Sequence, residues 1–592
     1  MPEPSYSPPS GFQVPKTNLR RIALLVLLGL VVLVPGTARI PLVDRDEPRF
    51  ARATVEMIEK NDWFVPYFNG NYRFDKPVLT YWLMRVGYTV FGQNELGARL
   101  HSIASTILTA LVILWAGSRW FTTTVGFIAA FGFLTCFQVV LNGRSCVADM
   151  PMVLFVAVAQ LMLFETLRQP TPRAQRPWML GFYAALGFGF LAKGPIAVLV
   201  PVLSLLLYRF AFWRRPVPWK NLKPHIGLPL MLLIVGAWGV PALVKTGGLF
   251  WKVGMNEHVV QRGMEVFHGR FYFPGFYLLT AFVSLAPWFA FAGRGWGVLR
   301  GNWRSENAFL VSWLAAPYLI FTFYATQLPH YVLPGFAAFF LVLAQVFDRP
   351  AVERAWMRWW FRCVIAIPIV LAILIGGLLA FALTHAAAAG IVPALTGLMG
   401  LLGGLAVVGL TARYGRRMGL WIGVLIIGIS VVFVGSGMRR MSPPVQMVPI
   451  FNQMPRGSAF MGWQFMEGTL VFYGRTYWTM TRDVDELEAF LQEPGPRLAV
   501  LLEKEIKLDR YFKWQVNRLL GRQEPLKVKD LTSQIERLDT EGYQMRRISG
   551  MNMGRFTWVT VRVYYRTGQR ASANGPFSAE PSVFLPGTMP SA

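Results

Sequence analysis

The chain has 592 residues, of which 54% are hydrophobic and only 15% are charged, and its mean hydropathy is +0.41. A soluble protein of this length would carry about a quarter charged residues, so the composition excludes that class. The net charge of +27 does not indicate nucleic-acid binding, because basic loops of a membrane protein set its orientation and contact anionic lipids. Its three cysteines, Cys136, Cys146 and Cys363, support neither a disulfide framework nor a zinc cluster.

Hydrophobic runs long enough to cross a bilayer recur along the chain, which predicts a polytopic α-helical membrane protein with about thirteen transmembrane helices. The expected spans lie near residues 21–38, 96–117, 122–141, 150–168, 178–192, 194–212, 226–246, 276–293, 307–325, 330–347, 363–384, 389–411 and 419–437. Residues 1–20 are rich in proline and serine and are expected to be disordered. Residues 22–34 would serve either as the first span or as the core of a signal peptide.

Lysine and arginine clusters give the expected orientation. When the N-terminus is placed in the cytoplasm, nearly every compact basic cluster falls on the cytoplasmic side. We therefore expect a multi-pass protein of the inner (plasma) membrane, with residues 21–440 as the membrane part and 39–95 as the first outer loop. Residues 441–569 are expected to form an extracytoplasmic α/β domain, followed by a disordered tail at 570–592. Its predicted strands are 470–474, 497–503 and 558–565, and its predicted helices are 484–492 and 509–520.

The first outer loop holds the densest polar chemistry. It contains the carboxylates Asp46 and Glu47 and the dipeptide Asp75-Lys76. Between these pairs, apolar residues at roughly helical spacing from Phe50 predict a short amphipathic helix along the membrane surface. Asp46 and Asp75 have a simpler alternative, since either side chain could merely cap a helix.

Other outer loops add further charges to the same side. Asp149 begins a span, and a carboxylate at a span mouth needs a partner. Lys76 precedes Pro77 and Lys193 precedes Gly194-Pro195, which predicts that each lysine lies at a helix N-terminus, where an anion is favoured. The alternative for Lys193 is that it extends to lipid headgroups.

The remaining polar candidates come from two later loops. The loop after residue 255 supplies His258 and Arg262, and Tyr331 follows in the loop after residue 325. Arginine can bind a phosphate in bidentate fashion, and His258 beside Glu257 has metal-capable chemistry. Their alternatives are contact with lipid headgroups for Arg262 and an aromatic belt for Tyr331.

Five motifs stand in a recognisable order: DEPRFA…WFVPYFNGNYRFDKPVLTYWL, a span-mouth aspartate, LAKGP, EHVVQR and LPHYVLP. In this order they resemble the ArnT-like branch of the GT-C glycosyltransferases. That branch includes the lipid A aminoarabinose transferases and is related to the dolichyl-phosphate-mannose protein mannosyltransferases. The likeness covers about residues 20–440, and the stretch at 546–566 resembles the closing strands of the extracytoplasmic domain of such transferases.

The resemblance implies a role for each matching position. Asp46 matches the catalytic aspartate of the first loop, with Glu47 beside it, and Asp149 matches a second aspartate that faces the cavity. The positions implied to hold the donor phosphate are Lys76, Arg262 and Tyr331, with Lys193 added from its own spacing. Asp75 and His258 match positions where members of the family can hold a divalent metal ion.

The implied reaction is the transfer of a sugar, with inversion, from a polyprenyl-phosphate donor to lipid A or another envelope glycolipid. The expected partners are the lipid-linked sugar, an envelope lipid or glycan acceptor and membrane lipids, with no nucleic acid and no nucleotide cofactor. A protein O-mannosyltransferase using the same type of donor is the close alternative. A transporter or a scaffold is a different class, but the prominent charges lie at span ends and no internal repeat is evident.

Overall fold

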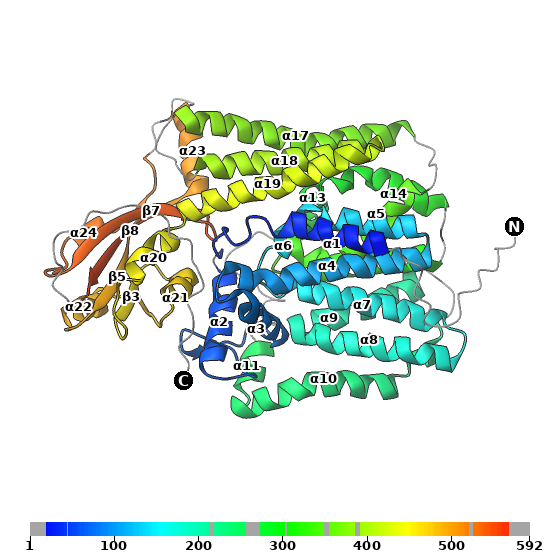
Figure 1. The fold of residues 1–592 in the computed structure, drawn as a ribbon, viewed down its shortest axis with the longest axis horizontal. Coiled ribbons are helices and arrows are strands. Elements are labelled where there is room, and N and C mark those ends of the chain that lie inside the picture. The colour runs from blue at the N-terminus through cyan, green and yellow to red at the C-terminus, as the bar shows by residue number, and fades with distance from the viewer. Residues whose placement is uncertain are drawn as a thin grey trace.

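The structure, a computed structural model, describes residues 19–567 apart from residues 44, 213–216, 256–272, 302, 304, 349–353, 385–390, 520–521 and 523–524. The predicted disordered tail, 570–592, and most of the predicted N-terminal segment lie outside these residues. Figure 1 shows two parts: a bundle of long helices, and a β-sheet with short helices at one end of the bundle. The short helices of the first loop lie at that same end.

The bundle follows the apolar runs of the sequence. Up to residue 255 its helices are α1 (Leu19–Leu33), α2 (Glu47–Glu59), α3 (Leu79–Phe91), α4 (Glu95–Trp120), α5 (Thr123–Leu134), α6 (Phe137–Gly143), α7 (Asp149–Arg168), α8 (Pro172–Lys193), α9 (Ile196–Leu207), α10 (Pro224–Lys245) and α11 (Leu249–Met255). The later ones are α13 (Phe276–Ser284), α14 (Ala292–Gly301), α15 (Ser305–Thr322), the 3-10 helix η6 (Pro329–Gly335), α16 (Phe336–Ala344), α17 (Ala355–Thr384), α18 (Ile391–Arg413) and α19 (Arg417–Met441).

Seven helices in the described part of the chain are long and apolar enough to cross a membrane, or up to nine if each of two bent pairs is one span. One bent pair is α5 with α6, which meet at 65°, and the other begins with α13 and bends by 108°. Each of the thirteen predicted segments contains helix, but α1 and α9 are shorter than a full span. The chain is therefore a multi-pass membrane protein, and the number thirteen stays a prediction.

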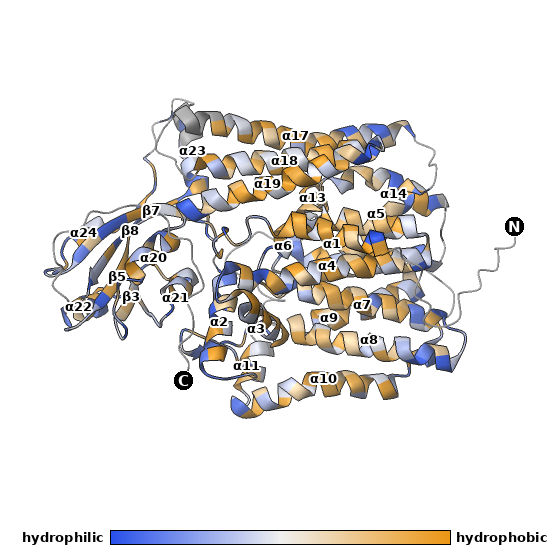
Figure 2. Ribbon diagram, in the orientation of Figure 1, coloured by the Kyte–Doolittle hydropathy of each residue, from blue (hydrophilic) through white to orange (hydrophobic). Residues whose placement is uncertain are grey.

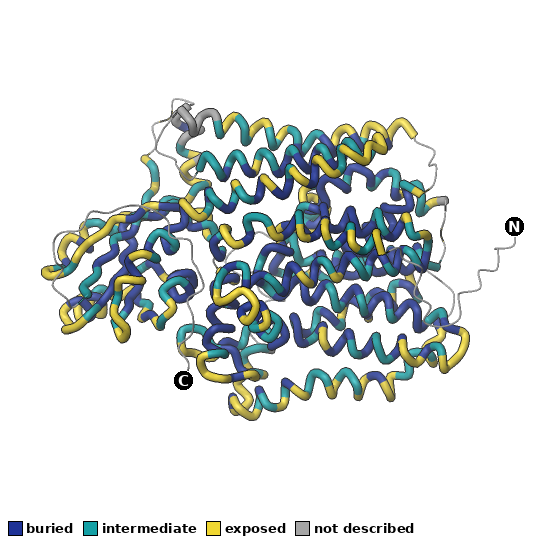
Figure 3. The backbone as a smooth tube through the Cα atoms, viewed as in Figure 1, coloured by how far each residue is buried: buried dark blue, intermediate teal, exposed yellow. Residues whose placement is uncertain are grey.

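Burial is uneven across the bundle. Hydrophobic residues run along the helices and hydrophilic ones gather at their ends (Figure 2). The apolar windows of α4 and α7 are 67% and 72% buried, whereas those of α10 and α17 are only 17% buried (Figure 3). Helices α4 and α7 therefore form the centre, and α10 and α17 are peripheral helices with bare apolar faces suited to lipid.

The sheet follows the bundle in sequence. Its strands are β3 (Ala459–Trp463), β4 (Thr479–Thr481), β5 (Arg497–Lys507), β6 (Lys529–Asp530), β7 (Gln544–Asn552) and β8 (Thr557–Arg566). Their order is β4-β3-β5-β8-β7, with β6 paired to β5. The pairs of β3 with β4 and with β5 are parallel, and the remaining pairs are antiparallel. Its helices are α20 (Pro443–Phe451), α21 (Gly468–Gly474), α22 (Val484–Gln492), α23 (Leu508–Leu519) and α24 (Thr532–Ile535).

The two faces of the sheet bury different helices. Alternate strand residues, such as Leu498 and Val500, pack against α20 and α21 on one face. Their neighbours Ala499 and Leu501 pack against α22 and α24 on the other. Because side chains alternate along a strand, β5 contributes to both cores.

Most of the strands and helices predicted after residue 441 are confirmed, but one is wrong. Strands are found at 497–503 and 558–565, and helices at 484–492 and, as far as the structure describes it, 509–520. Residues 470–474, predicted as a strand, belong to helix α21. A five-residue apolar run fits either period, and here burial of Leu470 and Val471 against the sheet selects the helix.

The helix predicted in the first loop is present as α2, but its predicted environment is wrong. Ten of its 13 residues are buried, including Arg52 and Glu56 from the faces expected to be polar. These two side chains pair with each other at 3.1 Å. After α2 the chain forms a two-stranded hairpin, β1 (Tyr67–Phe68) and β2 (Asn71–Tyr72). Helix α2 is thus enclosed by protein rather than lying on a lipid surface.

Candidate active site

Asp46 lies immediately before α2, at its N-cap position. Its side chain makes no capping hydrogen bond and is exposed, although its backbone oxygen accepts a bond from the amide of Phe50. The alternative that Asp46 merely caps the helix is therefore wrong. The carboxylate is left available at the surface of the first loop.

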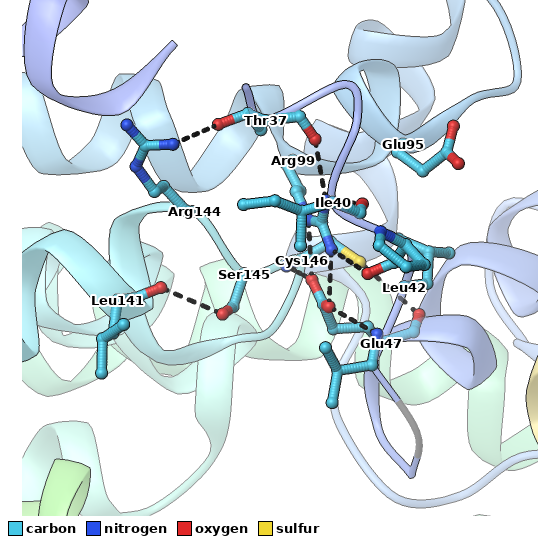
Figure 4. Close-up of polar contacts among 12 residues, drawn as sticks. Thr37, Ile40, Leu42, Glu47, Glu95, Arg99, Leu141, Arg144, Ser145 and Cys146 are labelled. Carbon is cyan, nitrogen blue, oxygen red and sulfur yellow. Dashed lines mark hydrogen bonds and ion pairs between the residues drawn. The ribbon is translucent and has the colours of Figure 1, made fainter. Parts of the chain in front are cut away.

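Glu47 occupies a very different environment, although it is the next residue. Its buried carboxylate accepts two bonds from Arg99, from Nε at 2.9 Å and Nη2 at 2.7 Å. The amides of Val43 and Cys146 donate to it as well, each at 2.8 Å (Figure 4). Burial alone would raise the pKa of Glu47, but Arg99 and the two amides hold it below its ordinary value. Four donors saturate this carboxylate, so its contacts support a structural role rather than the predicted catalytic one.

Arg99 connects helix α4 to the start of α2 and to the segment before it. Besides Glu47, its guanidinium donates to the carbonyl oxygens of Thr37 and Ile40, at 2.9 and 2.6 Å, and of Pro41, at 2.9 Å. Arg99 belongs to α4, and Glu47 also binds the connection before α7 through Cys146. The segment that carries Asp46 is therefore fixed to the centre of the bundle.

Asp75 and Lys76 follow the hairpin and precede α3. Asp75 forms an ion pair of 2.7 Å with Arg73, whose Nε donates to the hydroxyl of Tyr81 at 3.3 Å. Burial alone would lower the pKa of Arg73, but Tyr81, Asp75 and Asp46 raise it, so Asp46 lies within electrostatic reach. The ammonium of Lys76 donates to the backbone oxygen of Asp75 at 3.0 Å. Asp75 is thus engaged by a cation rather than acting as a simple helix cap.

Asp149 and Lys193 form the second half of the site. Asp149 is the buried first residue of α7, and its carboxylate pairs with the Lys193 ammonium at 2.5 Å. The imidazole of His330 lies 3.9 Å from the same carboxylate. The Lys193 ammonium also lies 5.4 Å from the ring centroid of Tyr331, on η6. The structure thus supplies the partner that the sequence required for Asp149.

The helix position predicted for Lys193 needs a correction. Lys193 is the last residue of α8, and Gly194 ends that helix with a φ of +81°. Helix α9 begins only at Ile196. A cation is favoured at a helix C-terminus, and Asp149 at the N-terminus of α7 is favoured for the opposite reason. The two dipole ends therefore support the ion pair.

The described site residues form a continuous row of alternating charge. Asp46 interacts electrostatically with Arg73, and Arg73 forms an ion pair with Asp75. Lys76 follows Asp75 in the chain and acts electrostatically on Asp149, which pairs with Lys193. The row is three carboxylates interleaved with three cations, and these come from the first loop, from α7 and from the end of α8.

An apolar cavity opens beside this row. Its volume is about 440 Å³, and its walls come mainly from α9, α10, α11 and α15. Its polar lining comes from side chains at the site: Asp75, Lys76, Lys193, Tyr324 and Tyr331. The lining therefore combines a large apolar wall with two lysine ammonium groups.

Two predicted site residues, His258 and Arg262, lie outside the described residues. Within the described part of the chain no three His, Cys, Asp or Glu side chains are grouped so as to hold a metal ion. Asp75, the other predicted metal ligand, pairs with Arg73. Because His258 lies outside the described residues, the divalent ion at Asp75 and His258 stays a prediction, and the residue roles proposed for this chain do not depend on it.

The sequence reasoning missed two arginines that form ion pairs with predicted site residues. Arg73 was not singled out, although it stands two residues before Asp75 in the motif it belongs to. Arg99 was missed because it lies within an apolar span, where a buried arginine itself signals a partner. Spacing alone does not reveal that this partner is Glu47, 52 residues earlier.

Comparison with known proteins agrees with this architecture. A family model described as dolichyl-phosphate-mannose-protein mannosyltransferase matches residues 75–239. Curated relatives from Erwinia tasmaniensis and Sodalis glossinidius are 32% and 31% identical over 335 and 339 residues. Both are named undecaprenyl phosphate-alpha-4-amino-4-deoxy-L-arabinose arabinosyl transferase, the second with the suffix 2. Each alignment covers 55% of this chain and 59% of the relative, so the chain spans about three fifths of the length of the curated relatives it matches.

A solved structure extends the likeness over nearly the whole chain. The crystal structure of ArnT from Cupriavidus metallidurans bound to undecaprenyl phosphate superposes with a TM-score of 0.69 at 21% identity. The match covers 94% of this chain and 99% of that one. At this identity the likeness shows the fold, which is the GT-C fold. Within that class the chain is similar in fold to ArnT, and over about half of its length it is similar in sequence to the curated arabinosyl transferases.

Proposed function

We propose that the chain is a membrane glycosyltransferase that moves a sugar from a polyprenyl-phosphate donor to lipid A or another envelope glycolipid. One observation carries the proposal: a mainly apolar cavity of about 440 Å³ has Lys76, Lys193 and Tyr331 in its lining. A polyprenyl phosphate matches this lining, because it combines a long apolar chain with an anionic head. The curated relatives are named for an undecaprenyl phosphate-linked sugar, which agrees with this match.

The lysine ammonium groups in the cavity lining suit the leaving group. When the bond between the sugar and the phosphate breaks, the electron pair and a growing negative charge remain on the lipid phosphate. Lys76 and Lys193 stabilise that charge because they are already in place before the reaction. Asp149 and the Tyr331 ring hold Lys193 at this rim.

The acceptor side is assigned to Asp46. In a single displacement with inversion, the acceptor oxygen attacks the anomeric carbon from the face opposite the phosphate. An acceptor hydroxyl passes its proton to a base, and Asp46 has an exposed carboxylate for this purpose. An acceptor phosphate needs no base, and Asp46 then orients it.

We place this chemistry on the outer face of the inner membrane. The basic clusters predicted to be cytoplasmic include the turn between α18 and α19. That turn lies at the end of the bundle opposite the sheet and α2 (Figure 1). Positive loops favour the cytoplasm, which supports an extracytoplasmic site and a cytoplasmic N-terminus.

The test is transfer from synthetic polyprenyl-phosphate sugars to purified lipid A, followed by mass spectrometry. We expect wild-type transfer, and its loss in Asp46→Asn and Lys76→Ala. The matched controls are Asp485→Asn, on exposed α22, and Lys60→Ala, on the first loop but outside the cavity lining. Transfer that survives both site substitutions would overturn the site. Loss on chelation, restored by Mg²⁺ or Mn²⁺, would support the divalent ion predicted at Asp75 and His258.

A second candidate is a protein O-mannosyltransferase. The description of the matching family model favours it, since that model covers the segment from Asp75 to the middle of α10. The two candidates share a donor type and differ in acceptor. A parallel assay with polyprenyl-phosphate mannose and a serine- and threonine-rich peptide separates them, because only the second candidate glycosylates the peptide.

A further inference from the structure

The β-sheet (β3 to β8) and its helices α20 to α24, which we call the sheet unit, touch both parts of the first loop that carry site residues. The contacts come from residues 473–478, at the end of α21 and just after it, which we call the clamp turn. One contacted segment, 41–47, carries Asp46, and the other, 67–76, ends at Lys76. A single short turn thus contacts the segments that carry Asp46 and Lys76, two members of the charge row.

Tyr473 holds the first segment. Its hydroxyl accepts a hydrogen bond from the amide of Leu42 at 3.1 Å and donates one to Glu95 at 3.1 Å. Loss of hydration and the nearby Glu95 raise the pKa of Tyr473 well above its ordinary value, so the hydroxyl keeps its proton and this bond. Glu95 also pairs with Arg439 at 3.2 Å. The loop before Asp46 is therefore held by Arg99 from the bundle and by Tyr473 from the sheet unit.

Asn69 holds the second segment. It lies in the turn of the hairpin with a φ of +55°, a conformation that asparagine tolerates better than most residues. Its side-chain amide donates to the carbonyl oxygen of Trp478 at 2.8 Å, and the amide of Trp478 donates back at 2.8 Å. The amides of Asn69 and Gly70 also donate to Glu56 of α2, at 2.8 and 3.0 Å. The hairpin is thus fixed to α2 and to the clamp turn at once.

The clamp turn is itself anchored. Leu470, Val471 and Trp478 are buried in the core that packs α20 and α21 against the sheet. The turn therefore moves with the sheet unit rather than as a loose loop. Because the same element bonds to the segments that carry Asp46 and Lys76, it constrains the separation between them.

We propose that Tyr473 and Asn69 are positioning residues, through which the sheet unit sets the placement of Asp46 relative to the donor-phosphate end of the site. This inference rests on the proposed function, in which Asp46 and Lys76 act on the same donor–acceptor pair. A displacement of about 1 Å between reacting groups can lower a rate about a hundredfold. Tyr473 holds only the segment that carries Asp46, so its loss should act on turnover rather than on donor binding, whereas Asn69 holds the segment that carries Lys76, which lines the cavity.

The test compares Tyr473→Phe and Asn69→Gly with Tyr543→Phe. Glycine retains the left-handed conformation at residue 69 while removing the side-chain bonds. Tyr543 is a matched control, because its hydroxyl donates to the carbonyl of Leu491 at 2.8 Å in the same unit, away from the first loop. We expect kcat to fall about tenfold or more in the two clamp variants, with melting temperatures equal to that of the control. The donor KM should be unchanged in Tyr473→Phe, because that variant leaves the segment of Lys76 in place.

Hydrogen exchange tests the clamp without turnover. In Tyr473→Phe we expect faster exchange in peptides spanning 37–47, and in Asn69→Gly in those spanning 67–76, with neither change in Tyr543→Phe. The proposal is overturned if kcat in both clamp variants matches the control, or if exchange rises evenly over the sheet unit. If wild-type protein transfers no sugar to any acceptor, the proposed function fails, while the exchange result still decides whether the clamp exists.

Discussion

The ion pair between Glu47 and Arg99 gives the sharpest prediction about the first loop. In Arg99→Met the side chain keeps an unbranched stem but loses the guanidinium and its five hydrogen bonds, two to Glu47 and three to carbonyl oxygens. Glu47 is only 5% exposed, so its carboxylate would be left buried without a cation. Breaking one side of a buried pair destabilises a protein by about 3–5 kcal/mol.

Glu47→Gln should cost less than Arg99→Met. The amides of Val43 and Cys146 donate to different oxygens of Glu47, so the single oxygen of glutamine retains only one of them. Arg99 loses its anion but keeps its bonds to three carbonyl oxygens, whereas Arg99→Met removes those bonds as well. The double variant removes both charges, so its loss should be smaller than the sum of the two single losses by about 1–3 kcal/mol. We therefore expect the order of stability to be wild type, then Glu47→Gln, then Arg99→Met, with the double variant above the additive value.

Thermal unfolding in detergent, followed by intrinsic tryptophan fluorescence, measures this order. Arg456→Met is the control, because Arg456 is exposed and lies after α20. Single variants as stable as the control would refute the structural role. So would a Glu47→Gln protein that keeps the wild-type melting temperature but transfers no sugar, since that result would make Glu47 catalytic as the sequence predicts.

Three further predictions concern other parts of the molecule. Lys193→Met leaves buried Asp149 without its cation, so we expect a lower melting temperature and a donor KM raised about tenfold. Lys193→Arg should retain more of the stability and more of the donor affinity. Burial alone would raise the pKa of Asp62, but its hydrogen bonds lower that pKa from its ordinary value of 3.8. The ionised carboxylate therefore stabilises the folded protein above pH 3.8, and this stabilisation is lost as the pH falls through the lowered pKa. The difference in melting temperature between wild type and Asp62→Asn should therefore shrink as the pH falls below 3.8, and a constant difference would contradict this. In Gly126→Val a Cβ would meet a backbone oxygen of α4 at 2.4 Å, so we expect a reduced folded yield, in contrast to Gly239→Ala, where no atom lies within 4 Å.

The sequence predicts the helices well because their signal is local. Apolar runs identify the long membrane helices, strand β5 follows from a short apolar run, and strand β8 follows from β-branched and aromatic residues. Helix α21 was missed because five apolar residues fit a strand and a helix equally. The environment of α2 was missed for another reason: Arg52 and Glu56 neutralise each other, so charged faces that look exposed in sequence can be buried.

The site was predicted in part. Charge type and position before proline identified Lys76 and Lys193, and the structure brings both to one cavity. What spacing cannot supply is partner choice between distant segments. Glu47 looked catalytic because it follows Asp46, yet Arg99 engages it; the exposure of these neighbours differs because Glu47 begins α2 facing the bundle while Asp46 precedes it.

The charges of the row offset one another, so the site is electrostatically stable without a bound donor. Among the described residues, three carboxylates offset three cations, and each buried charge has an opposite neighbour. In the proposed reaction a donor phosphate would add negative charge at Lys76 and Lys193, so Lys193 would divide its interaction between Asp149 and the donor. Asp149 would then weaken ground-state binding but keep Lys193 in place for the charge that develops on the leaving phosphate. Interactions that strengthen only as the bond breaks raise turnover rather than affinity, which is the use this geometry makes of an internal ion pair.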